Sequence, residues 1–203
     1  MKRLEDEIIK LKNSLEKIVK EKLNEFSKNI NLSPEEKFIH LCFCILVANT
    51  SLNKTFEIWK AIDKKFLTLT EEELKEELEK LGYRFPNRAS YIAYSRKYIK
   101  EIDNAVLKAD REWLVENIKG IGWKEASHFL RNMGYRDFAI LDRHVLRTLE
   151  EYKIIDKIPK SLSKKFYLET EGKLREIAKK LNMSIAELDF YLFYLRTKEL
   201  PKL

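Results

Sequence analysis

Apolar residues recur every three or four positions along most of this chain, a spacing that places them on one face of an α-helix. At the N-terminus the repeat predicts a long amphipathic helix whose buried positions are Leu4, Ile8, Leu11, Leu15 and Ile18. Residues 38–47 are almost entirely apolar, so the helix that contains them is expected at the centre of the core. The sequence has only five glycines and four prolines, and the predicted fold class is therefore all-α.

Several of the predicted helices begin at clear capping signals. Ser33 is followed by a proline at the first helical position and by Glu36 three residues on, which is the pattern of a capping box. Ser184 and Glu187 repeat that spacing ahead of the last helix, and Thr70 is placed to cap an acidic helix that follows it.

The most informative stretch is residues 117–147, where a glycine turn separates two helical patterns. Asp110 is placed to cap the helix before the turn, and Gly134 to end the helix after it. Gly120 and Gly122 both allow positive φ and close approach of another backbone. The free N–H groups of such a turn, at the start of a helix, suit a phosphate. An ordinary connection between two helices is the alternative interpretation.

Two side chains near this turn carry chemistry of their own. Lys124 lies in the first turn of a helix, where the helix dipole and partial burial both disfavour its charged form. A neutral amine is a nucleophile that can form a Schiff base. Asp142 opens the next helix, where it could accept a proton and stabilise a developing positive charge. The alternatives are a solvated surface lysine and a plain N-cap aspartate.

Composition narrows the class of partner. The 203 residues include 40 basic and 33 acidic side chains, a net charge of +7 that favours an anionic partner. Residues 1–22 are charged throughout and no apolar run reaches membrane length, so we expect no leader, no membrane span and a cytoplasmic protein. Cys42 and Cys44 are expected to be free core thiols, because two such close positions in one helix cannot pair comfortably.

The glycine turn, Lys124 and Asp142 together resemble the helix-hairpin-helix DNA glycosylase superfamily, and within it the short, archaeal-type 8-oxoguanine DNA glycosylase/AP lyases. The family's hairpin ends in Gly-x-Gly-x-Lys, which matches residues 120–124. Its catalytic aspartate precedes the next helix, as Asp142 does here. The family often has a proline before that aspartate, whereas Leu141 precedes it in this chain. The lysine distinguishes bifunctional members, so its presence implies lyase activity.

The architecture implied by this resemblance is a single compact unit over residues 1–203, with a DNA-binding cleft between two helical subdomains. Residues 33–107 would form the core subdomain, and residues 1–32 with residues 108–203 the helix-hairpin-helix subdomain. Some members of the superfamily bind an iron–sulfur cluster through four cysteines near the C-terminus. This chain lacks those cysteines, so no cofactor and no catalytic metal are expected. A cation that bridges the hairpin carbonyls to a phosphate is compatible with the resemblance.

The resemblance also suggests residues that contact the DNA. Asn49 resembles a family residue that meets the DNA near the gap left by the extruded base, although a plain C-cap is the alternative. Phe85 precedes a proline that pre-orients it, and it is a candidate for stacking on the extruded base or for simple packing. His128 lies one helical turn after Lys124, so we expect it to border the base, with packing against the other subdomain as the alternative.

The predicted function is removal of 8-oxoguanine from double-stranded DNA by a monomeric enzyme, followed by strand cleavage through β-elimination. Lys124 would attack C1′ of the extruded nucleotide, and Asp142 would accept a proton or stabilise charge on the sugar. The alternatives are a glycosylase for another oxidised base, a non-catalytic helix-hairpin-helix DNA-binding protein and a helical protein-interaction domain.

Overall fold

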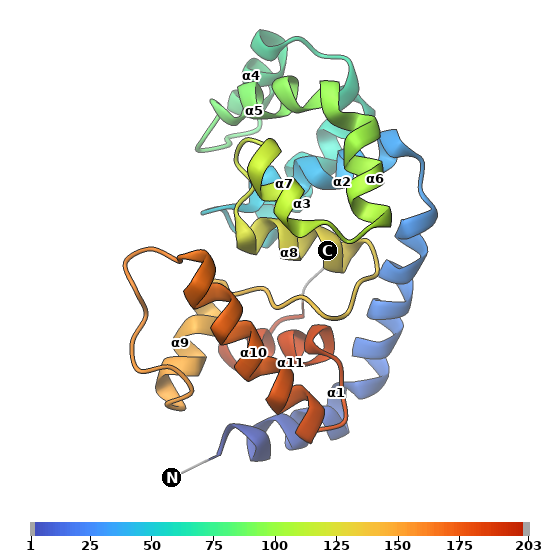
Figure 1. The fold of residues 1–203 in the computed structure, drawn as a ribbon. Coiled ribbons are helices and arrows are strands. Elements are labelled where there is room, and N and C mark those ends of the chain that lie inside the picture. The colour runs from blue at the N-terminus through green and yellow to red at the C-terminus, as the bar shows by residue number, and fades with distance from the viewer. Residues whose placement is uncertain (1–2, 201–203) are drawn as a thin grey trace.

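The computed structural model describes residues 3–200, which fold into helices joined by short turns and by two longer loops, at residues 133–142 and 152–163 (Figure 1). The α-helices of this range are α1 (Leu4–Ser27), α2 (Pro34–Val47), α3 (Leu52–Ile62), α4 (Glu71–Lys80), α5 (Arg88–Ser95), α6 (Ile99–Leu107), α7 (Arg111–Asn117), α8 (Trp123–Asn132), α9 (Arg143–Glu151), α10 (Lys164–Lys180) and α11 (Ile185–Thr197). Short 3-10 helices are η1 (Lys28–Asn31), η2 (Asp63–Leu67) and η3 (Arg96–Tyr98). No β-strand occurs between residues 3 and 200, so the predicted all-α class is confirmed.

Helix α2 is the centre of the first group of helices. Every residue from position 38 to position 47 is buried except His40, as its apolar sequence predicted. Helices α3, α5, α6 and α8 pack directly against α2, and α4 packs against α5. Because α2 is covered on all of its faces, it has no polar stripe, and its burial anchors the hairpin helix α8.

A second group of helices lies at the opposite end of the molecule (Figure 1). Helices α9 and α10 pack on α11, and α11 packs along α1. Helix α1 then reaches the first group and contacts α8. Helices α7 and α8, which the expected division assigned to the second subdomain, pack against α6 and α2 of the first group. The chain crosses between the two groups in residues 133–142.

The buried stripe of α1 departs from the prediction along the helix. Leu4 and Ile8 are buried and Leu11 and Leu15 are half-buried, but Ile18 is 50% exposed and Val19 is buried in its place. A helix of 3.6 residues per turn drifts away from a strict repeat of 3.5, so the stripe moves by one position over this length.

The predicted capping boxes are confirmed. In α2 the Ser33 hydroxyl accepts the Glu36 N–H at 3.2 Å, and the Glu36 carboxylate accepts the Ser33 N–H at 2.9 Å. The same reciprocal pair of hydrogen bonds opens α4 at Thr70 and α11 at Ser184. None of the helices in the described range combines the length and the apolar content needed to cross a membrane.

Candidate active site

The glycine turn joins α7 and α8 into a hairpin. Asp110 caps α7, since its Oδ1 accepts the Trp113 N–H at 3.0 Å, as predicted. Ile118 and Ile121 lie on either side of the turn and are 2% and 4% exposed. These two buried side chains fix the turn to the core, so that the residues between and beyond them are held in place.

The two glycines of the turn have different roles. Gly120 has a φ of +81°, and a Cβ added to it would lie 2.7 Å from Cδ2 of Tyr91 on α5. Gly122 has a φ of −100° and a ψ of −172°, which is ordinary extended backbone. Its N–H instead donates to Oε2 of Glu125 at 3.3 Å, which caps the start of α8. Of the two glycines that could adopt positive φ, only Gly120 does so.

Lys124 is the second residue of α8, and its side chain is 22% exposed. Its Nζ lies 2.9 Å from Oε1 of Glu125, whose side chain is 14% exposed. Glu125 thus holds the hairpin backbone with one oxygen and the lysine with the other. Sequence reasoning missed Glu125, although its position three residues after the N-cap is the spacing of a capping box.

Asp142 is the N-cap of α9, as predicted. Its Oδ1 accepts the N–H groups of His144 and Val145, both at 2.8 Å. Because one oxygen accepts both hydrogen bonds, the cap holds the carboxylate in one orientation and does not require the second oxygen. The cap and a catalytic role are therefore compatible in the same side chain.

Hydrogen bonds tie the surroundings of Lys124 and Asp142 to one another. Ser127 follows Lys124 by three residues on α8, and Leu141 directly precedes Asp142. The hydroxyl of Tyr167, on α10, lies 3.2 Å from Oγ of Ser127 and accepts the Leu141 N–H at 3.3 Å. The helix that carries the lysine and the loop that carries the aspartate therefore meet at one buried side chain.

Buried charges also connect the two residues. Burial raises the pKa of Cys44 to about 12, and the charges of Lys124 and Arg131 oppose that rise. Burial raises the pKa of Asp189 to about 7 against the charge of Arg131, while the charge of Asp142 raises it further. Arg131 Nη1 lies 3.3 Å from Oδ2 of Asp189. Burial lowers the pKa of Arg131, and the charges of Asp189, Cys44 and Asp142 oppose that change.

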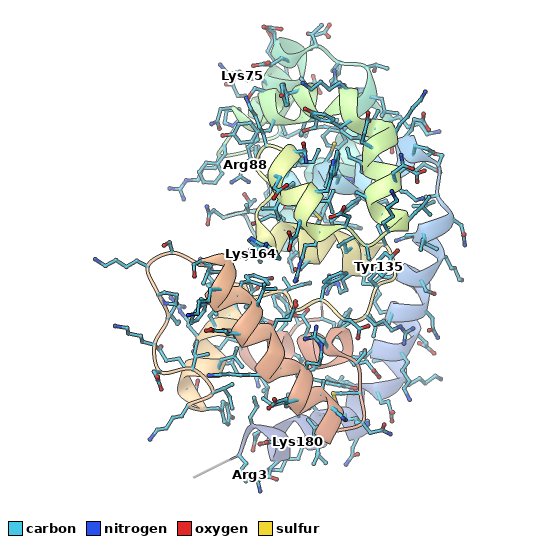
Figure 2. All side chains as sticks on the ribbon, viewed as in Figure 1. Arg3, Lys75, Arg88, Tyr135, Lys164 and Lys180 are labelled. Atoms are coloured by element: carbon cyan, nitrogen blue, oxygen red, sulfur yellow. The ribbon has the colours of Figure 1, made fainter. Side chains whose placement is uncertain are left out.

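Asn49 and Phe85 lie near the C-terminal end of α2. Asn49 is exposed and has a φ of +58°, a conformation that asparagine tolerates better than most residues. Phe85 is half-buried, with the Arg88 guanidinium 4.9 Å from the centre of its ring. Arg88 in turn donates to the carbonyl of Leu46, and Figure 2 labels this arginine on the first group of helices.

His128 lies in the interior. It is 5% exposed, and its ring meets that of Phe43 edge-on with centroids 5.8 Å apart. The structure therefore places it against α2, apart from the exposed turn at Asn49.

Cys42 and Cys44 are free and buried, as expected. Within residues 3–200, no group of three or more His, Cys, Asp and Glu side chains is arranged to hold a metal ion.

An all-helical fold with a glycine hairpin, a partly buried lysine just after it and a capped aspartate on the following helix defines a helix-hairpin-helix protein. Residues 19–183 match the family described as 8-oxoguanine DNA glycosylase. The chain belongs to this family.

Relatives and solved structures agree with this assignment. The chain is 50% identical to an 8-oxoguanine DNA glycosylase/AP lyase of Methanocaldococcus jannaschii, over 96% of this chain and 97% of that protein. It is 43% identical to the protein of the same name from Thermotoga maritima, with the same coverage. The crystal structure of the M. jannaschii protein in complex with a 15mer DNA containing 8-oxoguanine has a TM-score of 0.94 and 48% identity, covering 98% of this chain and 99% of that one. The T. maritima structure has a TM-score of 0.93 and 41% identity, covering 98% of each.

Proposed function

We propose that this chain removes 8-oxoguanine from double-stranded DNA as a monomer and then cleaves the strand at the resulting abasic site. The observation that carries the proposal is Lys124, a partly buried amine at the first turn of the hairpin helix. Tyr167 contacts both this helix and the loop that leads to the capped Asp142. The names of relatives at up to 50% identity support both the glycosylase and the lyase activity.

The chemistry follows from these two side chains. The target nucleotide turns out of the duplex, because C1′ cannot be reached in the stack. The amine of Lys124 attacks C1′, the bond to the base breaks, and the base leaves with the bonding electron pair and takes up a proton. The sugar ring opens to an imine with the lysine, loss of a proton from C2′ follows, and the 3′ phosphate departs. Asp142 accepts the proton of Lys124 and stabilises positive charge on the sugar.

The hairpin and its neighbours supply a surface for the DNA backbone. Lys119, in the turn, lies 4.7 Å from the ring centre of Tyr94, and Lys97 lies 3.8 Å from the same ring. In this proposal Asn49 meets the duplex near the gap, Phe85 stacks on the extruded base, and His128 borders the base from the interior. Because the contacts are mainly to phosphates, log Kd should change with log salt by roughly 0.9 per neutralised phosphate.

Replacing Gly120 by alanine should weaken binding to damaged and undamaged duplexes alike, by about tenfold, because φ of +81° and the contact with Tyr91 both disfavour a Cβ. Gly122→Ala is the matched control, since that residue has extended backbone and only the Glu125 carboxylate nearby at 3.2 Å. Dissociation constants measured at one salt concentration provide the comparison. A loss confined to damaged DNA, or a larger loss for Gly122→Ala, would contradict this role of the turn.

A panel of duplexes, each with a single damaged base, tests the proposed function. We expect excision and strand cleavage at 8-oxoguanine, with undamaged DNA left intact. Preferential cleavage at an oxidised pyrimidine would identify a glycosylase for another lesion. Binding without any cleavage would identify a non-catalytic DNA-binding protein, and loss of all binding at moderate salt would favour a protein-interaction domain.

A further inference from the structure

A buried polar cluster lies behind the site, where α7, α8 and α10 meet the loop that leads to Asp142. Its members are Arg111, Ser127, Tyr167 and Glu171, which are between 0% and 7% exposed. Arg111 makes two hydrogen bonds to the Glu171 carboxylate, at 2.6 and 3.0 Å, and a third to Oγ of Ser127 at 3.0 Å. The hydroxyl of Tyr167 lies 3.2 Å from the same Oγ, so the four side chains form one connected network across three helices.

The network holds the backbone of the loop at three points. The carboxylate of Glu171 accepts the Ala139 N–H at 2.9 Å. The hydroxyl of Tyr167 donates to the Ala139 carbonyl at 2.6 Å and accepts the Leu141 N–H at 3.3 Å. Buried backbone groups in a loop need such partners, and here the partners all belong to α10. The loop position is thus set by side chains and not by a regular hydrogen-bond ladder.

The held segment ends at Asp142. The Asp142 N–H donates to the Ile140 carbonyl at 2.8 Å, which closes a tight turn with Leu141 at its centre. Leu141 does not have a positive φ, so this turn is an inverse γ-turn. Asp142 is then fixed on its other side by the cap of α9. A shift of Leu141 would therefore move the carboxylate directly.

The same network reaches the helix of the nucleophile. Oγ of Ser127 donates to the carbonyl of Trp123, the residue before Lys124, at 2.8 Å. The Arg111 guanidinium lies 4.7 Å from the ring centre of Trp123, and Lys164 at the start of α10 lies 5.4 Å from that ring (Figure 2). These contacts fix the first turn of α8 against α10.

A buried ion pair is a weak source of stability, because the loss of hydration offsets most of the attraction between the charges. Apolar side chains of similar volume would fill the same space at least as favourably. What the polar network supplies is directional bonding to one loop conformation. We propose that the Arg111–Ser127–Tyr167–Glu171 network sets the position of Asp142 relative to Lys124, so that Tyr167 is a positioning residue. This inference rests on the proposed function.

Tyr167→Phe tests the inference, since it removes one hydroxyl and keeps the ring. Under single-turnover conditions with saturating enzyme, release of 8-oxoguanine should slow by roughly 10- to 100-fold, because small misplacements of catalytic groups have effects of this size. The dissociation constant for the duplex should change by less than about threefold, because Tyr167 is buried on α10 and makes no contact with the glycine turn. A purely structural role would lower the fraction of folded protein without changing the rate at saturation.

Tyr135→Phe is the matched control. Tyr135 lies near the start of the same loop and is labelled in Figure 2. Its hydroxyl donates to the Val106 carbonyl at 2.6 Å, and Val106 is far from Asp142 in the sequence. The Tyr135→Phe variant loses a comparable hydrogen bond but should release 8-oxoguanine at the same rate as the unsubstituted protein. Ser127→Ala provides a second, smaller change that leaves α8 intact, and its rate should also fall.

The positioning role would be overturned if Ser127→Ala, or a folded Tyr167→Phe, released 8-oxoguanine as fast as the unsubstituted protein. So would a Tyr135→Phe protein as slow as Tyr167→Phe. If the unsubstituted protein itself released no base, the proposed function would fail instead, so the two failures are distinguishable.

Discussion

Lys124→Gln is expected to abolish both strand cleavage and covalent capture of the DNA. An amine that has attacked C1′ is joined to the opened sugar as an imine, and borohydride reduces this imine to a stable amine. The unsubstituted protein incubated with an 8-oxoguanine duplex and borohydride should therefore form a protein–DNA adduct, which peptide mapping should place on Lys124. Glutamine keeps most of the length of the side chain but is not a nucleophile, so the variant should still bind the damaged duplex.

Lys119→Gln is the matched control for this experiment. Lys119 lies five residues earlier, in the turn, and its Nζ contacts the ring of Tyr94 on α5. Its loss should weaken phosphate contacts but leave trapping intact. Full trapping by Lys124→Gln would refute the assignment of the nucleophile. Base release without cleavage in that variant would mean that water attacks C1′ in place of the amine.

Asp142→Asn should lower turnover by roughly 10²–10⁴-fold, the range of acid–base and electrostatic groups, with little change in stability. The reason for this separation is the geometry of the cap. One oxygen accepts both backbone N–H groups, and the amide oxygen of asparagine can accept the same pair. The substitution therefore removes the charge and retains the cap. Single-turnover rates and thermal unfolding of the same preparation measure the two effects.

Asp110→Asn provides a control with identical chemistry at another helix. Asp110 caps α7 through its Oδ1, and the same change there should leave both stability and turnover nearly unaltered. If Asp142→Asn unfolded but kept full activity per folded molecule, capping would be the whole role of this aspartate.

The sequence by itself determined where several helices begin, and it supplied the candidate residues for the chemistry. The caps at Ser33, Thr70, Ser184, Asp110 and Asp142 were all predictable, because each cap joins atoms no more than three residues apart. The hairpin was predictable for the same reason. Glu125 was within reach of this reasoning as well, since its bond to the Gly122 N–H spans three residues.

Features that depend on how a helix is rotated about its axis, or on a neighbouring helix, were harder to predict from the sequence. The choice between Ile18 and Val19 depends on how α1 lies against α11, which a repeat of three and four residues does not fix. Position 120 requires glycine, because its φ is positive and because Tyr91 of α5 lies where a Cβ would be. In the sequence Gly122 cannot be told from Gly120, and only the backbone conformations of the two residues separate their roles.

Only the tertiary structure decided how the helix of Lys124 and the loop before Asp142 are held together. The bond between Arg111 and Glu171 joins residues 60 positions apart, and that between Tyr167 and the Ala139 carbonyl joins residues 28 apart. In the sequence Arg111 and Glu171 are two among 40 basic and 33 acidic side chains, most of which are solvated. Periodicity predicts the face of a helix on which a residue lies. It does not predict the partner that this face meets, because that depends on how the chain packs.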